Sequence, residues 1–250
     1  MSKRDNIYAS QGSKPGPFRF DDQVVAVFPD MINRSVPGYA LIVPMIGQIA
    51  RRYVQPGSVV HDLGSSLGAV SLAIQGGLSG RSDLGSTRII ATDNSPAMVN
   101  RFTELLATRA RADHKAVPLQ PVLGDIRDVD FSGASMVVLN FTLQFLALDE
   151  RDTLLRRIAD GLLPGGVLVL AEKICFEDEA VQRDQTNWHH DYKRMQGYSD
   201  MEIAGKRAAL EEVLLTESEA THVARMEAAG FRRVTRWFQC FAFCAWLAEK

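Results

Sequence analysis

A glycine loop near residue 64 has the residue types that let a protein backbone come close to a ligand. The segment HDLGSSLG follows an apolar run, and Gly64 and Gly68 permit a tight turn and a close approach. Ser65 and Ser66, between them, are small and keep the loop slim. In a sheet of parallel strands, ligands bind beyond the carboxyl ends of the strands, so this loop is a candidate binding site.

Two aspartates follow the next two apolar runs and fit the recognition of a nucleoside. Asp93 comes directly after RIIAT, and its carboxylate can accept both hydroxyl groups of a ribose. Asp125 in LGDIRD can receive an exocyclic amine of adenine, and Ile126 offers an apolar surface to the ring. Taken singly, Asp93 can instead cap the next helix and Asp125 can form a turn. Together, the two residues favour a nucleoside site.

The glycine loop has two other interpretations. A nicotinamide dehydrogenase is one, but the segment reads Gly-x-x-x-Gly and lacks the GxGxxG that rests a pyrophosphate on a helix N-terminus. A glycine turn that holds no ligand is the other.

The spacing of apolar residues predicts the elements that position these side chains. The apolar patterns over 22–28 and 39–53 predict two helices that are separated by the breaker Pro37-Gly38. Further helices are expected up to about 75, from 95 to about 111, over 150–162 and over 218–230. Strands are expected from 59, at 88–92, within 118–125, 135–146 and 161–173, and twice within 231–249. Residues 1–20 are expected to form an N-terminal arm with few apolar anchors, and residues 175–215 a polar helical insert.

This alternation predicts a single α/β domain over residues 1–250. We expect a Rossmann-like, doubly wound, mostly parallel sheet with N-terminal helices, a helical insert after the fifth strand and a C-terminal antiparallel strand pair.

Composition narrows the class of protein further. The 250 residues are 46% hydrophobic and 23% charged, which is typical of a globular protein that buries its own core. The formal charge of -2 disfavours direct binding to nucleic acid or to an anionic membrane. Three cysteines without a CxxC pair favour the reducing cytoplasm, and neither an export signal nor a membrane span is expected.

The motifs DLGSSLG, IIATDNSPAM, GDIRD, LLPGGVLVLAEK and AAGF resemble those of class I S-adenosylmethionine-dependent methyltransferases over residues 59–250. Further segments resemble the carboxy-S-adenosyl-L-methionine synthase family over nearly the whole chain. They are RDNIYA, VFPDMINRSVPGYALIVPMIG, SMVVLNFTLQFL, HHDYKRMQGYSDMEIAGKR and WFQCFAFCAW. The resemblance implies that S-adenosyl-L-methionine is carboxylated at its methyl carbon with a group from prephenate, which leaves as phenylpyruvate. It also implies that a separate tRNA-modifying enzyme uses the product, carboxy-S-adenosyl-L-methionine, at wobble uridines.

The resemblance also implies a homodimer whose insert serves as lid and subunit contact. Arg207 would reach from the insert to the added carboxylate of the neighbouring subunit, and Arg207 and Tyr39 are the expected catalytic residues. Ser65 stands where some relatives have cysteine, and the loop GGLSGRSDLGSTR is longer than usual. The residues expected to line the cofactor site are Tyr39, Gly64, Ser65, Ser66, Asp93, Asn94, Asp125, Ile126, Asn140 and Arg207.

Other chemistry-bearing residues have plainer expected roles. His189, His190 and Asp191 lack the spacing of a metal triad, and no metal is expected. Cys240 and Cys244 are expected on one face of a strand, in the core. A basic stretch of helix is expected to be a solvated face rather than a tRNA patch. Three aromatic residues of the insert are expected either to wall the substrate pocket or to pack the insert. The basic residues are Arg101, Arg109, Arg111 and Lys115, and the aromatic ones are Trp188, Tyr192 and Tyr198.

The residues alone leave open both the role of Arg207 and the function of the protein. Arg207 could pair with Glu211, four residues away on one helix face, instead of binding a carboxylate. A methyltransferase acting on a small acid and a nucleoside-binding dimer without turnover are the alternatives to the carboxyl-transfer enzyme.

Overall fold

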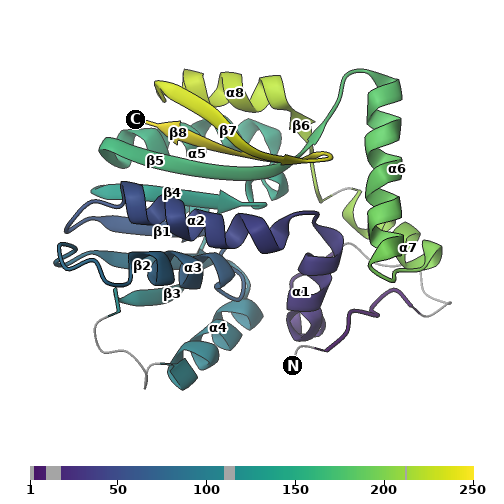
Figure 1. Ribbon diagram of the computed structural model, residues 1–250, viewed down its shortest axis with the longest axis horizontal. Coiled ribbons are helices and arrows are strands. Elements are labelled where there is room, and N and C mark those ends of the chain that lie inside the picture. The colour runs from purple at the N-terminus through teal and green to yellow at the C-terminus, as the bar shows by residue number, and fades with distance from the viewer. Residues whose placement is uncertain (1–2, 10–17, 110–115, 212) are drawn as a thin grey trace.

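The computed structural model describes residues 3–9, 18–109, 116–211 and 213–250 (Figure 1). One sheet runs through it, with the strand order β3-β2-β1-β4-β5-β8-β7, and β6 pairs with β5 beside this path. The strands are β1 (Val59–Leu63), β2 (Arg88–Asp93), β3 (Leu119–Leu123), β4 (Ala134–Asn140), β5 (Leu162–Cys175), β6 (Glu217–Ser218), β7 (Arg233–Cys240) and β8 (Phe243–Glu249).

The central strands β1, β4 and β5 are parallel, with β1 and β4 almost wholly buried and β5 buried over its middle, from Gly166 to Glu172. Their runs of valine and leucine suit strands that are covered on both faces. The last two strands, β8 and β7, are antiparallel to their neighbours. The predicted fold class is therefore confirmed, while the two-residue strand β6 was not predicted.

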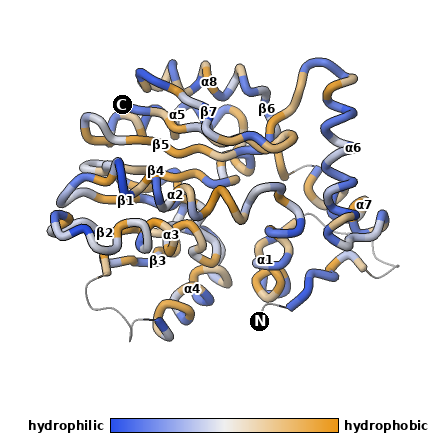
Figure 2. The backbone as a smooth tube through the Cα atoms, in the orientation of Figure 1, coloured by the Kyte–Doolittle hydropathy of each residue, from blue (hydrophilic) through white to orange (hydrophobic). Residues whose placement is uncertain are grey.

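Helices cover both faces of the sheet (Figure 1). Between the sheet and its helices lie two core clusters, one on the side of α5 and α8 and the other on the side of α2 and α3. Figure 2 shows hydrophobic residues along the central strands. The helices are α1 (Asp22–Ser35), α2 (Tyr39–Tyr53), α3 (Ala69–Leu78), α4 (Pro96–Arg109), α5 (Leu148–Gly161), α6 (Glu179–Met195), α7 (Asp200–Leu210) and α8 (Glu219–Ala228). Two short 3-10 helices, η1 (Ile126–Asp128) and η2 (Leu143–Phe145), follow β3 and β4. No helix in the described ranges is long and apolar enough to cross a membrane.

The described parts of the N-terminal arm are anchored, so the expectation of few apolar anchors is wrong. Phe18 is buried, and Phe20 packs beside it in a third core cluster between α1 and α4. The carbonyl oxygen of Phe20 also accepts a hydrogen bond from the Ser95 hydroxyl. Helices α1 and α2 are separated at Pro37-Gly38, as predicted, and burial of Met31 and Ser35 in the second half of α1 outweighs the donor lost at Pro29.

The insert is helical, as predicted, and lies along the carboxyl edge of the sheet at the right of Figure 1. The side chain of Asp178 caps α6, and Ser199 and Glu202 form a capping box that starts α7. At the end of α1, the Ser35 carbonyl is 2.8 Å from Nε2 of His189, and the Ser35 hydroxyl is 2.9 Å from Nζ of Lys206. Ser35 thus ties α1 to both insert helices.

The two C-terminal cysteines do not share a strand, which corrects the sequence prediction. Cys240 ends β7 and Cys244 lies in β8, on opposite sides of a turn at Phe241, whose φ is 50°. Cys244 is fully buried in the core, as expected, while Cys240 is only partly buried.

Candidate active site

The glycine loop makes a turn that only small residues fit. Gly64 and Gly68 have φ angles of 72° and 77°, in the left-handed region that favours glycine. A Cβ at Gly68 would lie 1.9 Å from the ring of Phe102, and one at Gly64 would lie 2.5 Å from Thr142. Ser66 between them also has a positive φ, of 53°, a strained conformation of the kind that persists where the surroundings hold it.

Asp93 holds this loop from the end of β2. Its carboxylate accepts hydrogen bonds from the Ser66 N–H at 2.8 Å and from the Ser95 N–H at 2.9 Å. Burial raises the pKa of Asp93, and these two N–H groups oppose the rise. The alternative role of Asp93 as the cap of α4 is wrong, because Ser95 directly precedes the helix and its hydroxyl accepts the Met98 N–H. Each oxygen of Asp93 keeps a further lone pair for a ligand. Asn94, the next residue, is exposed.

Asp125 lies at the end of β3 and forms the turn that was its alternative role. Its carboxylate caps η1 through the Arg127 N–H at 2.9 Å and also pairs with the Arg127 guanidinium, which lowers the pKa of Asp125. Ile126 is buried in the core and is only 8% exposed, so it offers little side-chain surface to a ring. An adenine amine would have to share Asp125 with Arg127.

Two predicted residues present polar atoms that need a ligand or water. Ser65 Oγ and Asn140 Oδ1 are buried and have no hydrogen-bond partner among the described residues. Buried polar groups are rarely left unpaired, because the lost hydrogen bond costs about 1–3 kcal/mol. Ser65 lies in the glycine loop and Asn140 ends the adjacent strand β4, so both lie at the carboxyl edge.

Tyr39 and Asp62 approach the loop from the other side. Tyr39 begins α2, and burial and the nearby Asp62 raise the pKa of its phenol. Asp62 in β1 is buried and accepts a hydrogen bond of 2.5 Å from the Ser71 hydroxyl, and burial raises its pKa to about 6. Sequence analysis did not select Asp62, although it stands two residues before Gly64.

Arg207 lies exposed near the end of α7. Burial and the positive charge of Arg207 lower the pKa of Lys173 in β5, and burial, Lys193, Arg194 and Arg207 lower that of His190 in α6, so Arg207 acts on residues of its own chain. Within the described residues it forms no ion pair with Glu211, and the alternative pairing is wrong. Sequence analysis also missed Lys173, Lys193 and Lys206, although the WHHDYKR and GKR segments that carry the last two stood out.

His189, one of the two histidines of α6, is buried and packs edge-on against the ring of Phe243. Burial and Lys193 lower its pKa to about 3. Across the described part of the chain, no group of three or more His, Cys, Asp or Glu side chains could hold a metal ion.

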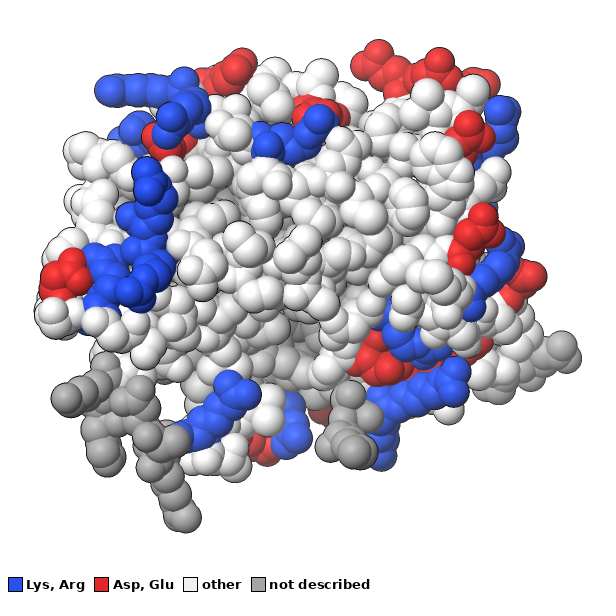
Figure 3. Space-filling view, in the orientation of Figure 1, with Lys and Arg blue, Asp and Glu red and all other residues white. Residues whose placement is uncertain are grey.

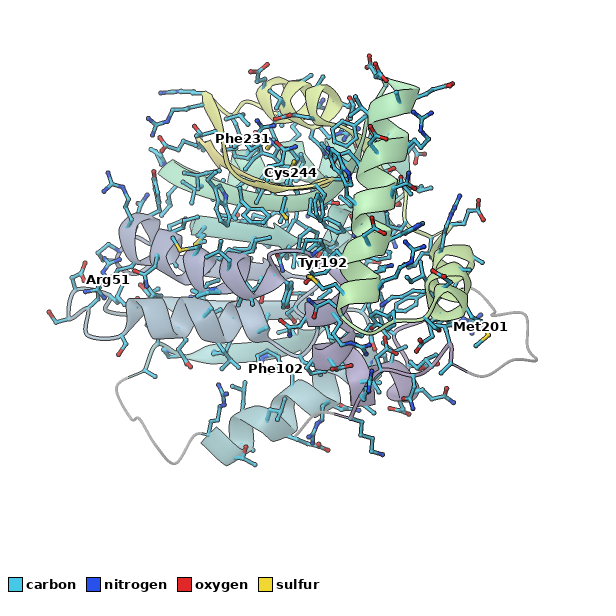
Figure 4. The ribbon with its side chains drawn as sticks, turned by 45° about the vertical axis from the view of Figure 1, so that its right-hand side comes forward. Arg51, Phe102, Tyr192, Met201, Phe231 and Cys244 are labelled. Atoms are coloured by element: carbon cyan, nitrogen blue, oxygen red, sulfur yellow. The ribbon has the colours of Figure 1, made fainter. Side chains whose placement is uncertain are left out.

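The aromatic residues of the insert divide between two places. Trp188, Tyr192 and Met195 of α6, with Asp191 and Phe241, line a pocket of about 550 Å³, and Figure 4 shows Tyr192 directed toward α1. Tyr198 instead packs the insert, since its hydroxyl donates to Asp5 at 2.5 Å. On the expected solvated face of α4, Arg101 is paired with Glu104 and Arg109 is exposed, while Arg111 and Lys115 lie outside the described residues.

Comparisons with known proteins agree with this fold. Residues 61–170 match the methyltransferase domain family. Among solved structures, a putative O-methyltransferase from Nostoc punctiforme has a TM-score of 0.59 at 16% identity, over 92% of this chain and 60% of that chain. Human N-acetylserotonin methyltransferase in complex with SAM has a TM-score of 0.58 at 18% identity, over 92% of this chain and 55% of that chain. The fold is that of S-adenosylmethionine-dependent methyltransferases.

Full-length relatives narrow this class. The carboxy-S-adenosyl-L-methionine synthase of Shigella sonnei is 49% identical over 251 residues, which span 100% of this chain and 98% of that protein. The protein of the same name from Escherichia coli O1:K1 is 50% identical with the same coverage. The chain belongs to the carboxy-S-adenosyl-L-methionine synthase family, a family of transferase enzymes.

Proposed function

We propose that this protein converts S-adenosyl-L-methionine and prephenate into carboxy-S-adenosyl-L-methionine and phenylpyruvate. Family membership over the full length supports this reaction. The feature of the structure that supports it is Arg207, an exposed positive charge near the end of α7 that acts on Lys173 in β5. A second anion next to the sulfonium needs such a charge, whereas a plain methyl donor does not.

The nucleoside end of S-adenosyl-L-methionine is proposed to lie over the glycine loop. Asp93 would accept the ribose hydroxyl groups, with Asn94 beside it. Asp125 and the backbone of Ile126 would meet the adenine. The unpartnered atoms of Ser65 and Asn140 fit polar groups of the same ligand. The remaining residues proposed to line this site are Gly64, Ser66, Tyr39 and Arg207.

The proposed reaction balances without a base from the protein. Prephenate loses its ring carboxylate as CO2 and its hydroxyl group as hydroxide, which leaves phenylpyruvate. The hydroxide takes a proton from the S-methyl carbon and becomes water. The resulting ylide carbon then forms a bond to CO2, giving the carboxymethyl sulfonium.

Positive charge would stabilise each stage of this sequence. The sulfonium stabilises the adjacent carbanion, and the planar guanidinium of Arg207 matches a carboxylate with two parallel hydrogen bonds. Tyr39 is proposed to keep its proton, because its pKa is raised, and to orient the sulfonium end as a hydrogen-bond donor.

Mass spectrometry of a reaction with both substrates tests the proposed function. The expected product is heavier than S-adenosyl-L-methionine by the mass of CO2, and it forms together with phenylpyruvate. Transfer of a methyl group to a small acid would establish the methyltransferase instead. Binding of S-adenosyl-L-methionine with no turnover on either kind of substrate would leave the nucleoside-binding dimer.

We also propose a homodimer of single-domain subunits, joined through the insert and α2. Exposed apolar residues recur every seven positions along α6, at Val181, Trp188 and Met195. Leu41 and Met45 of α2 are exposed as well, and Figure 3 shows a broad uncharged area at the centre of this view. A self-complementary apolar face of this kind suits a symmetric dimer.

The dimer is tested by placing a charge on the seam formed by Val181, Trp188 and Met195. Trp188→Glu and Met195→Glu should give monomers by light scattering, because the buried glutamate would lack a partner. Arg183→Glu, which changes a solvated position of the same helix, is the control and should remain dimeric. Monomeric wild-type protein would overturn the proposal.

The proposal also covers the use of the product, the compartment and the role of the insert. A separate tRNA-modifying enzyme would consume the carboxylated product at wobble uridines, since the net charge of -2 gives this chain no general attraction for RNA. Its three free cysteines suit the reducing cytoplasm. The insert would serve as the lid of the substrate side.

A further inference from the structure

Three lysines meet at the carboxyl edge without having been assigned a role. Lys173 lies in β5, two positions before its end at Cys175, Lys193 lies in α6 and Lys206 lies in α7. Lys193 is 8% exposed and Lys206 is 7% exposed, while Lys173 is partly buried. Lysines are almost never buried to this degree unless they are paired. Their surroundings therefore decide what the cluster does.

The positive charges form a row that starts at Arg207. Arg207 lowers the pKa of Lys173, Lys173 lowers that of Lys193, and Lys193 lowers that of Lys206. Lys173 is therefore close enough to feel the charge of Arg207 and to act on Lys193. The row therefore has two ends, one at Arg207 and one in the insert.

Only the insert end of the row is balanced by carboxylates. Lys206 donates to Ser35 Oγ at 2.9 Å and lies 4.0 Å from Asp5 Oδ2. Asp30, the other nearby carboxylate, is paired with Arg34 at 3.1 Å.

Lys173 and Lys193 have no such partner. Within the described ranges, neither Nζ atom forms an ion pair or a side-chain hydrogen bond. An ammonium that is largely withdrawn from water and has no counter-charge is costly, and an anion that enters between these lysines would offset that cost.

We propose that Lys193 and Lys173 bind the oxoacid carboxylate of prephenate, the one that phenylpyruvate retains, while Arg207 faces the carboxylate that is transferred. The assignment rests on the proposed function, because it takes its ligand from that reaction. Prephenate carries two carboxylates, and a row of charges with one end near the sulfonium binds both at once. Lys206, held by Asp5 and Ser35, positions Lys193 through the packing of α7 on α6.

Kinetics of a Lys193→Met protein test this subsite. The loss of a charge-assisted hydrogen bond should raise the KM for prephenate about 10- to 100-fold. Inhibition by phenylpyruvate should weaken by a similar factor, because the product keeps the same carboxylate. Affinity for S-adenosyl-L-methionine should not change. The variant should melt no lower than wild type, because methionine removes an unpaired buried charge.

Arg194→Met is the matched control. It removes one charge from the next position of α6, where Arg194 is exposed and pairs with Asp191 and Asp200. Its KM for prephenate and its inhibition by phenylpyruvate should equal those of wild type. Unchanged phenylpyruvate inhibition in Lys193→Met would overturn the subsite.

Different results would reject the proposed reaction and the proposed subsite. If wild-type protein forms no carboxylated product, the proposed reaction is wrong. Calorimetric titration of phenylpyruvate into wild-type and Lys193→Met proteins still decides the subsite in that case. Equal affinity, or no binding to either protein, rejects it, and binding lost only in the variant supports it.

Discussion

Asp93 shows how one side chain serves both the structure and the proposed ligand. Its oxygens hold the N–H groups of Ser66 and Ser95, which fixes the glycine loop against the start of α4. The same oxygens face the position proposed for the ribose. Loop geometry and cofactor affinity therefore depend on a single carboxylate.

Replacing Asp93 with alanine should weaken binding of S-adenosyl-L-methionine about 10- to 100-fold, as two hydrogen bonds to a charged acceptor are lost. Isothermal titration calorimetry measures this directly. Asp130→Ala is the control, because Asp130 is exposed and its carboxylate binds only Ser132. Unchanged affinity in the Asp93→Ala protein would remove Asp93 from the site.

The buried lysines predict a dependence on pH. Burial and Lys173 lower the pKa of Lys193 to about 8, with Asp5 opposing, and burial and Lys193 lower that of Lys206 to about 7. Lys193 is thus charged below pH 8 and loses its proton above it. Prephenate stays fully ionised there, so its KM should rise as pH increases through about 8.

Steady-state kinetics between about pH 6 and pH 9 check this sign. In the Lys193→Met protein the KM should be high throughout, without the rise near pH 8. A wild-type KM that falls as pH increases would contradict the charge assigned to Lys193.

At the scale of elements, α2 and α3 pack backbone against backbone. A Cβ at Gly77 in α3 would lie 2.0 Å from the Gly47 carbonyl oxygen in α2, whereas a Cβ at Gly76 would meet nothing within 4 Å. Helix α2 also carries Tyr39, so this crossing sets the position of the site.

The two glycines form a matched pair for mutation. Gly77→Ala should lower the free energy of unfolding by about 1–3 kcal/mol or more, because the backbone must move apart. Gly76→Ala should raise it by about 0.5–1 kcal/mol, since alanine favours the helix. Chemical denaturation measures both, and equal effects would contradict the close crossing.

The sequence predicted elements whose residues act locally and missed those that depend on distant contacts. The apolar runs of β1, β4 and β5 identify buried strands by themselves. The anchoring of Phe18 was missed, because it depends on packing between helices that are distant in the sequence. Lys173 and Lys193 are far apart in the sequence, so only the folded chain shows that their charges meet.

At the scale of the whole molecule, Arg207 can complete the site of its own subunit or that of its partner. Arg207 is exposed, and its charge acts on Lys173 of its own chain. The family resemblance places it across the interface. The two arrangements differ in what a mixed dimer can do.

Mixing Arg207→Ala protein with Asp93→Ala protein separates them. If Arg207 acts across the interface, one of the two sites in a mixed dimer combines intact halves, and activity should recover. Subunit exchange is verified by mass spectrometry of the intact dimers. No recovery after exchange would show that Arg207 acts within its own subunit.

The anchoring of the arm by Asp5 has a practical consequence for attaching this protein to a surface. Asp5 bonds to Tyr198 and lies beside Lys206, so the N-terminal segment is tethered to the insert. The other end of the chain lies at the amino end of β5, where Nζ of Lys250 donates to the Leu162 carbonyl. A linker at the C-terminus therefore immobilises the molecule with its substrate side facing the solution, whereas one at the N-terminus crowds that side.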